Sequence, residues 1–282
     1  MIDSQEIFGL SDTSLTLLQE LIHQRTGLTF FDGKQSLLAE KLAGRIIERG
    51  FSNYLDYYYL LKYDTQAEEE WREVLNRLSV PETYFWREFD QIRILVNVIV
   101  PAYFAQKKAG PLRIWSAACA SGEEPLTLAM ALKEAGHLDR YPIEIVASDG
   151  SGQAIQRAQA GLYSKRSFRS IPQEIWDRYF SPVGDRWQID PAVHGRVQWH
   201  TANLMDASQI DPLARSHMIF CRNVFIYFSD TAIRQTVEQF AAQMLAPGYL
   251  FVGVSESLLR LPVPFALEEI QGAFIYRSQV QA

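Results

Sequence analysis

Residues 112–125 read LRIWSAACASGEEP, and this stretch decides the fold class. The apolar run at residues 112–117 is typical of a buried strand, and the small residues after it predict a tight turn into a helix. Small side chains let a ligand approach the backbone closely. Glu123 and Glu124 stand where the helix should begin, and carboxylates there favour the helix dipole but repel phosphate groups. The turn therefore argues against a phosphorylated nucleotide as the ligand.

The composition is that of an ordinary water-soluble chain, with 282 residues, of which 48% are hydrophobic and 21% charged. This length suffices for one large domain, or for a large and a small one. No apolar run approaches the roughly 18 residues of a membrane span. The first residues, MIDSQEIFGLSD, lack the basic-then-apolar pattern of a signal peptide. We therefore predict a cytoplasmic protein with no direct membrane insertion.

Charge and metal-ligating residues argue against two further classes of function. The formal net charge of −6 disfavours general affinity for nucleic acid. Cys119 and Cys221 lie far apart in sequence, and the five histidines do not cluster, so no metal ion is expected. Neither cysteine has a histidine neighbour in sequence that would activate it, and both are predicted to be small packed residues.

The first part of the chain, residues 1–80, is predicted to be an all-helical domain. Between residues 11 and 79 the apolar residues recur at helical spacing in four segments, and no strand pattern is present. Thr65 and Glu68 match a capping box at the start of the last segment, TQAEEEWREVLNRL. Four short helices of this kind predict a small bundle.

The remainder, residues 81–282, is predicted to be an α/β domain with a doubly wound parallel sheet. Short β-rich runs such as LRIWSA, IEIVASD and HMIFC alternate with helical patterns such as EEPLTLAMALKEAG and TAIRQTVEQFAAQML. The last two runs, FALEEIQ and AFIYRS, are too close together for a crossover helix and predict an antiparallel hairpin. Residues 181–199 predict an irregular insertion or a small β excursion.

Ligands of such sheets bind beyond the carboxyl ends of the strands, so the residues that follow each strand are the candidate ligand-binding residues. Asp149 ends IEIVASD, and folds of this type place a carboxylate there on the hydroxyl groups of a ribose. Taken alone, Asp149 fits a helix N-cap better, and the SAACASGEEP turn fits a ligand-free connection equally well. Asn203, Arg222 and Asn223 end two further runs, and agreement among four strand ends favours a nucleoside site.

The same residues resemble a known family, the chemotaxis receptor methyltransferases of the CheR type. These enzymes use S-adenosylmethionine to methylate glutamate side chains of receptors, and the order of a small helical region before an α/β domain is also theirs. The resemblance covers most of the chain and is carried by TYFWRE (83–88), WSAACASGEEP (115–125), ASD (147–149), AGLYS (160–164), NL (203–204) and CRNVFIYF (221–228).

The resemblance implies that S-adenosylmethionine is the cofactor, that S-adenosylhomocysteine is the product, and that a sulfonium with an amino-acid end occupies the acidic turn. The cofactor-binding residues that it implies are Thr83 and Arg87 from the linker, Glu124, Asp149 at the ribose, Asn203 and Leu204 at the adenine end, and Arg222 with Asn223 at the floor of the pocket. Two departures from the family pattern are Pro81, where Asn is frequent, and Gly150, where a branched apolar residue is usual.

Arg87 and Tyr227 are the residues that the resemblance places at the site of methyl transfer. Without it, Tyr227 fits core packing equally well, and Arg87 could form a surface ion pair with Glu88 or Asp90. The reaction itself needs no general base, because a glutamate is already ionised near neutral pH. An arginine and a tyrosine hydroxyl suffice to hold such a carboxylate.

A basic face on the second predicted helix is a candidate docking surface. Lys41, Arg45 and Arg49 follow one another at a spacing of four residues, with Lys34 seven before Lys41. The alternative is a solvated face whose charge is offset by Glu40 and Glu48. The resemblance places receptor contact on this helical region, so the predicted partner is the cytoplasmic helical bundle of a chemoreceptor, bound by a monomeric enzyme. The alternative function is a non-catalytic module that binds the cofactor and docks on a receptor.

Overall fold

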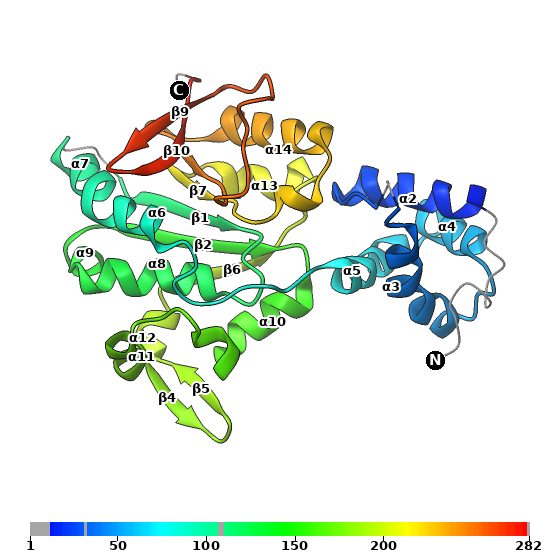
Figure 1. Cartoon of the computed structure of the whole chain (residues 1–282), viewed down its shortest axis with the longest axis horizontal. Helices are drawn as coiled ribbons and strands as arrows, with labels where there is room; N and C mark the ends of the chain where they lie inside the picture. Colours follow the sequence, from blue (N-terminus) through cyan, green and yellow to red (C-terminus); the bar gives the residue numbers. More distant parts are fainter. Residues whose placement is uncertain (1–11, 31–32, 107–109, 281–282) are drawn as a thin grey trace.

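The computed structural model describes residues 12–30, 33–106 and 110–280. Four N-terminal helices form a bundle at one end of the molecule, and an extended linker joins them to an α/β domain (Figure 1). Their bounds are α2 (Asp12–Thr26), α3 (Gln35–Glu48), α4 (Tyr54–Tyr63) and α5 (Ala67–Leu78). The bundle has a core of its own, with Leu18, Ile22, Leu42 and Val74 fully buried. The predicted all-helical region is thus confirmed.

The predicted capping box at the start of α5 is wrong. The helix begins at Ala67, and Asp64, not Thr65, holds the preceding turn by accepting a hydrogen bond from the Gln66 N–H over 2.8 Å. Glu68 pairs with Arg25 instead of with a backbone N–H group at the start of the helix. An aspartate two residues before the N-cap residue Gln66 offers a side-chain oxygen acceptor as a threonine does, so the sequence pattern did not distinguish the two arrangements.

The α/β domain is built on a seven-stranded sheet with the order β6-β2-β1-β7-β8-β10-β9. Five strands are parallel, and β10 and β9 form the predicted antiparallel hairpin. The strand bounds are β1 (Leu112–Ala117), β2 (Ile143–Asp149), β6 (Val197–Thr201), β7 (Met218–Phe220), β8 (Tyr249–Phe251), β9 (Phe265–Ile270) and β10 (Ala273–Ser278). The doubly wound fold class predicted from the alternation is confirmed.

Helices cover both faces of this sheet, which is why its strands read as continuous apolar runs. Ile114 and Ile145 face one core, with α8 (Glu123–Glu134) and the segment α6 (Phe89–Ile94), η1 (Leu95–Ile99) and α7 (Val100–Ala105). Trp115, Val146 and Ile219 face the other core, with α13 (Ala207–Ala214) and α14 (Asp230–Gln243). Figure 1 shows the two helical layers on opposite sides of the strands. The sequence patterns described above did not predict the helices between Phe89 and Ala105.

A small three-stranded sheet with the order β3-β5-β4 projects from the body of the domain (Figure 1). Its strands are β3 (Leu162–Ser164), β4 (Phe180–Val183) and β5 (Arg186–Ile189). The remaining helices are α9 (His137–Arg140), α10 (Gly152–Ala160), η2 (Lys165–Phe168), α11 (Gln173–Tyr179), α12 (Pro191–His194) and η3 (Phe225–Tyr227). Cys119 and Cys221 are buried free thiols, as predicted, and burial raises the pKa of each.

The helical domain lies against the edge where the parallel strands end. His23 Nε2 is 2.7 Å from Ser229 Oγ, and Ser151 Oγ donates to Asn76 Oδ1 over 2.8 Å. Leu28 forms an isolated β-bridge with Phe228. The carboxyl edge of the sheet, where this fold binds ligands, is therefore covered by the bundle and the linker. Within the described residues no helix is long and apolar enough to cross a membrane.

Candidate active site

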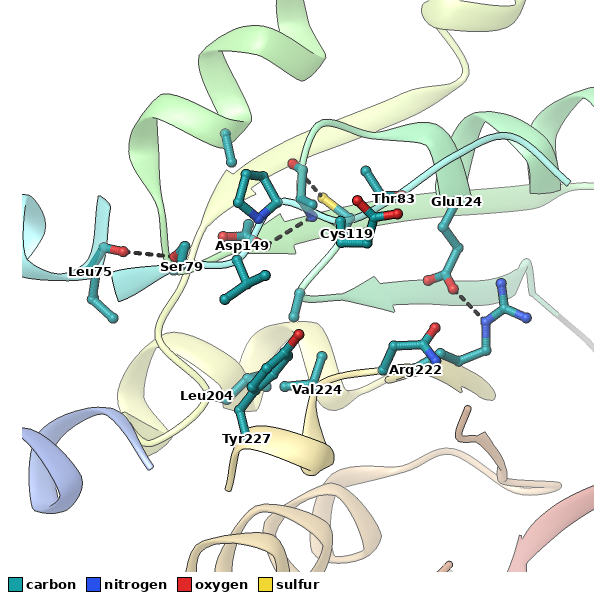
Figure 2. A pocket seen from close by; sticks show the side chains of 18 of the residues that line it. Leu75, Ser79, Thr83, Cys119, Glu124, Asp149, Leu204, Arg222, Val224 and Tyr227 are labelled. Carbon is teal, nitrogen blue, oxygen red and sulfur yellow. Dashed lines mark hydrogen bonds and ion pairs between the residues drawn. The ribbon is translucent and has the colours of Figure 1, made fainter. Parts of the chain in front are cut away.

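A cavity of about 260 Å³ lies between the strand ends, the linker and the helical bundle. All nine residues that the sequence proposed for the cofactor and the transfer site line it, namely Thr83, Arg87, Glu124, Asp149, Asn203, Leu204, Arg222, Asn223 and Tyr227. Figure 2 shows several of them around one hollow, contributed by segments far apart in sequence. The structure therefore brings the proposed residues to one place, and their separate roles stay predictions.

The turn after β1 is held in an unusual backbone conformation. Ala118 and Ala120 have φ values of 55° and 49°, in the left-handed region that residues with a side chain rarely occupy. The Cβ atom of an alanine is itself strained at positive φ, so the surrounding structure must hold the turn in this conformation. Such strain clusters where a backbone must meet a ligand. The small residues noted in the sequence therefore serve the shape of the cavity wall.

Asp149 supports this turn. Its Oδ2 accepts a hydrogen bond from the Ala120 N–H over 2.9 Å, and its Oδ1 accepts one from the Ser151 N–H over 2.8 Å. The side chain is buried, and burial raises the pKa of the carboxyl group. The second of these bonds resembles a helix cap, but Ser151, not Asp149, is the N-cap residue of α10. Each carboxylate oxygen keeps a lone pair, which a ribose hydroxyl can use.

Glu124 and Arg222 form a buried ion pair beside the turn. Arg222 Nε donates to Glu124 Oε2 over 2.6 Å, and the Arg222 side chain is only 2% exposed. The other Glu124 oxygen accepts from Ser116 Oγ. Arg222 also donates to the backbone carbonyls of Arg87 and Glu88, at 2.9 and 3.0 Å. The pair thus ties the linker to the ends of β1 and β7.

A second carboxylate, which the sequence did not single out, fixes the neighbouring loop. Glu256 accepts hydrogen bonds from the backbone N–H groups of Asn223, Val224 and Gly253, at 2.6–2.8 Å. Asn223 has a φ of 61°, and its amide donates to Glu88 Oε1. Glu256 follows the fifth parallel strand, β8. Extending the strand-end argument to that strand would have found it.

Arg87 does not form the surface ion pair considered from the sequence. Its Nη1 donates to the Glu82 carbonyl over 2.7 Å, and its guanidinium lies 5.5 Å from the centre of the Tyr84 ring. Asp90 pairs with Arg93 instead, and Glu88 contacts Asn223 and Val254. Arg87 is therefore directed by the linker toward the cavity that Thr83 also lines.

Tyr227 is half-buried, and its hydroxyl group points into the cavity (Figure 2). Its backbone carbonyl accepts from the Thr29 N–H over 2.9 Å, so the helical bundle also fixes this residue. Leu204 is a buried wall of the cavity. Asn203 donates its side-chain amide to the Arg25 carbonyl over 2.7 Å, a contact to the other domain that the sequence did not predict.

The basic face of α3 lies next to α5. Arg45 donates two hydrogen bonds of 2.7 Å to the Glu70 carboxylate, and Arg49 Nε is 3.4 Å from the same carboxylate. Lys41 Nζ donates to the Arg77 carbonyl. The Glu70 side chain is 3% exposed, so Arg45 has a structural partner inside the bundle. Receptor docking by these residues stays a prediction.

The lining of the cavity fits S-adenosylmethionine. Asp149 supplies negative charge that suits a cationic cofactor, whereas Glu124 and Glu82 are each paired with arginine. The exposed backbone of the turn suits the amino-acid end, and Leu28, Leu204 and Val224 supply apolar wall for a nucleoside base. A Cβ at Gly150 would make ordinary contacts, with Leu75 side-chain atoms at 3.6 and 3.8 Å and with the Ala202 carbonyl oxygen at 3.9 Å. Among residues 12–30, 33–106 and 110–280 no cluster of side chains could hold a metal ion.

Comparison with known proteins agrees with this geometry. Residues 13–79 match the family model for the CheR methyltransferase all-alpha domain, and residues 81–274 match the CheR methyltransferase SAM binding domain. Chemotaxis protein methyltransferase 2 of Vibrio cholerae is 32% identical over 93% of this chain and 91% of its own length. Chemotaxis protein methyltransferase of Escherichia coli is 28% identical, over 95% and 92%. A solved structure, magnesium protoporphyrin IX methyltransferase from Synechocystis with bound SAM, covers 78% of this chain and 91% of its own at 12% identity, with a TM-score of only 0.33.

Proposed function

The chain belongs to the CheR methyltransferase family, and from that premise we propose that it methylates glutamate side chains in the cytoplasmic helical bundle of a chemoreceptor. It is an S-adenosylmethionine-dependent methyltransferase, and S-adenosylhomocysteine is its product. The observation that carries the proposal is the joint lining of one cavity by Asp149 and by Arg87 and Tyr227. The first suits a nucleoside, and the other two suit a substrate carboxylate.

Asp149 and the turn hold the cofactor in this proposal. The ribose hydroxyls donate to Asp149, whose position is set by the Ala120 and Ser151 N–H groups. Glu124 acts through Arg222, because both of its oxygens are engaged by Arg222 and Ser116. The bound cofactor supplies an activated methyl group on a cationic sulfur.

Arg87 and Tyr227 hold the target carboxylate. Methyl transfer is an in-line displacement in which opposite charges neutralise, so water slows it by stabilising the separated charges. Alignment of the two partners in a dry cavity is the main contribution of the protein. Arg87 and the Tyr227 hydroxyl donate hydrogen bonds that orient the carboxylate, and the half-buried side chain of Leu28 and the buried one of Leu204 help exclude water. No residue needs to accept a proton.

The decisive experiment measures methyl transfer from radiolabelled S-adenosylmethionine to cytoplasmic fragments of the chemoreceptors encoded in the same genome. We expect label in base-labile methyl esters on glutamate, and no label on fragments whose methyl-accepting glutamates are replaced by alanine. A protein that binds S-adenosylhomocysteine tightly but esterifies none of the fragments would instead be a non-catalytic module.

Docking and location complete the proposal. We place the enzyme in the cytoplasm as a monomer, where receptor signalling domains are reached without membrane insertion. The basic face of α3 is proposed to contact the receptor through Lys34, Lys41 and Arg49, the members other than the tightly paired Arg45. Each exposed ion pair of this kind contributes about 0.2–1 kcal/mol, so the face steers the receptor rather than fixing it.

A further inference from the structure

A second basic segment, KRSFR at residues 165–169, lies beside the cavity and has no part in the site described above. Its inner residues are anchored. Ser167 and Phe168 are buried, whereas Arg166 and Arg169 have side chains that are 68% and 42% exposed. The segment therefore presents charge to solvent from a fixed backbone.

Three contacts set the position of this segment relative to the active site. Ser167 Oγ donates to Glu123 Oε1 over 3.0 Å, which joins it to the turn after β1. The Phe85 N–H donates to the Ser167 carbonyl over 2.9 Å, which joins it to the linker that carries Thr83 and Arg87. Phe168 stacks on Phe85 with a ring-centre distance of 5.4 Å. A substrate that reaches Arg87 therefore passes close to this segment.

The exposed arginines converge on the cavity wall. Arg166 and Arg169 both pair with the Glu82 carboxylate, and the Arg169 guanidinium lies 3.7 Å from the centre of the Tyr84 ring. The Arg87 guanidinium lies 5.5 Å from the centre of the same ring and donates to the Glu82 carbonyl. The hydrogen bond from Arg169, with that from Arg166, lowers the pKa of Glu82, so this carboxylate stays ionised. Two guanidinium groups thus share the Glu82 carboxylate, and a third, that of Arg87, donates to the backbone carbonyl of the same residue.

We propose that Arg166 and Arg169, positioned by Glu82, form a cationic rim that binds acidic side chains next to the methyl-accepting glutamate on the substrate helix. This inference rests on the proposed function. On a helix, residues three and four positions from the target lie about 5–6 Å from it, so they reach the mouth of the cavity when the target enters. The rim then selects glutamates with acidic neighbours. Its arginines determine specificity and are not catalytic residues.

The rim differs from the basic face of α3 in how its charges are paired. Arg45 is locked to Glu70, a carboxylate that is 3% exposed. Glu82 is 37% exposed, and the two arginines that share it keep excess positive charge in solvent. Substrate carboxylates can join this pairing without breaking a buried contact. On a chain with a net charge of −6, the rim also offsets the repulsion of an acidic substrate.

The test uses the full-length enzyme with receptor fragments in two forms, unaltered or with the glutamates flanking the methyl-accepting one changed to glutamine. We expect Arg166→Ala to raise the KM for the unaltered fragment about threefold and Arg166→Glu about tenfold or more, with kcat and S-adenosylhomocysteine affinity nearly unchanged. The KM of the Arg166→Ala enzyme for the unaltered fragment should depend less on salt concentration than that of the wild type. Wild-type enzyme should prefer the unaltered fragment, Arg166→Ala should show a weaker preference, and Arg166→Glu should prefer the glutamine fragment.

Arg277 provides a matched control, because it is also an exposed arginine in an exposed ion pair, with Glu268. It pairs in register with Tyr249 at the start of β8, at the opposite edge of the sheet from the cavity. Arg277→Glu should leave the KM of both fragments unchanged. The proposal is contradicted if the Arg166→Glu enzyme discriminates between the fragments as the wild type does. It is also contradicted if Arg277→Glu shifts the KM as much as Arg166→Glu does. Wild-type enzyme that esterifies neither fragment would instead refute the proposed function.

Discussion

The side-chain amide of Asn203 donates a hydrogen bond of 2.7 Å to the backbone carbonyl of Arg25, and this contact joins the methyltransferase domain to the helical bundle at the wall of the cavity. The other end of the same amide accepts from the Met205 N–H. Asn203 therefore fixes the loop after β6 while it holds the bundle in place. Because Asn203 also lines the cavity, we predict that cofactor binding and domain contact are coupled through this side chain.

Asn203→Asp should weaken both properties. The substitution replaces a donor with a carboxylate oxygen that faces the Arg25 carbonyl. Loss of the hydrogen bond and repulsion between the two oxygens at this buried site cost about 1–3 kcal/mol. We expect a lower thermal midpoint and weaker S-adenosylhomocysteine binding by calorimetry. Asn97→Asp, the same change at an exposed position of η1, is the control and should affect neither. Unchanged binding in Asn203→Asp would mean that the bundle is not part of the cofactor site.

Asp149→Ala should reduce cofactor affinity about ten- to hundredfold, which corresponds to about 1.5–3 kcal/mol for lost charge-assisted hydrogen bonds. Part of that loss comes from the turn, because Asp149 also accepts from the Ala120 N–H. A dideoxy analogue of S-adenosylhomocysteine that lacks both ribose hydroxyls separates the two effects. The wild type should prefer the natural product, and Asp149→Ala should bind both ligands equally. If Asp149→Ala still prefers the natural product to the dideoxy analogue, Asp149 does not bind the ribose hydroxyls.

The pH dependence of cofactor binding should report the raised pKa of Asp149. Burial raises this pKa in the free protein, whereas ribose hydroxyls bind the ionised carboxylate best. Affinity for S-adenosylhomocysteine should therefore rise with pH through the raised pKa and then level off, above the range near 3.9 where an ordinary aspartate titrates. Asp149→Asn should remove this dependence. Calorimetric titrations between about pH 4 and pH 8 would reveal it.

Tyr227→Phe should lower the rate of methyl transfer while cofactor affinity stays nearly intact, because only the orientation of the target carboxylate is disturbed. Single-turnover rates with labelled cofactor measure this. Tyr63→Phe removes a hydroxyl from a tyrosine that is 68% exposed and serves as the control. Wild-type turnover in Tyr227→Phe would leave the Tyr227 side chain with a packing role only.

The basic face of α3 should divide into structural and docking members. Arg45→Ala leaves Glu70 buried beside Tyr57 and should lower the free energy of unfolding by about 2–4 kcal/mol, measured in urea. Burial raises the pKa of Glu70, but the hydrogen bonds from Arg45 and Tyr57 outweigh it and hold the pKa below its usual value.

Docking is better tested with Lys34→Glu combined with Lys41→Glu, since neither contacts Glu70. We expect stability close to that of the wild type and a receptor KM raised about threefold at low salt. Normal methylation kinetics in this double variant would mean that the basic face is only solvated and does not contact the receptor.

The sequence by itself determined the fold class and the place of the site. Alternation of apolar runs with helical patterns predicted the parallel sheet, because strands buried on both faces carry no polar alternation. The strand-end rule then led from Asp149 to Arg222, since parallel strands end at one edge. These are local signals, and each can be read within about twenty residues.

Only the tertiary structure decided which polar groups meet. Arg222 contacts the linker 135 residues earlier in the chain, Asn203 contacts Arg25 across 178 residues, and Arg166 contacts Glu82 across 84. No local period encodes such pairs, so the sequence placed Arg45 on a docking face when Glu70 already holds it. The pairing of a charged side chain depends on which element packs beside it, and that is set by the burial of the cores rather than by the charges themselves.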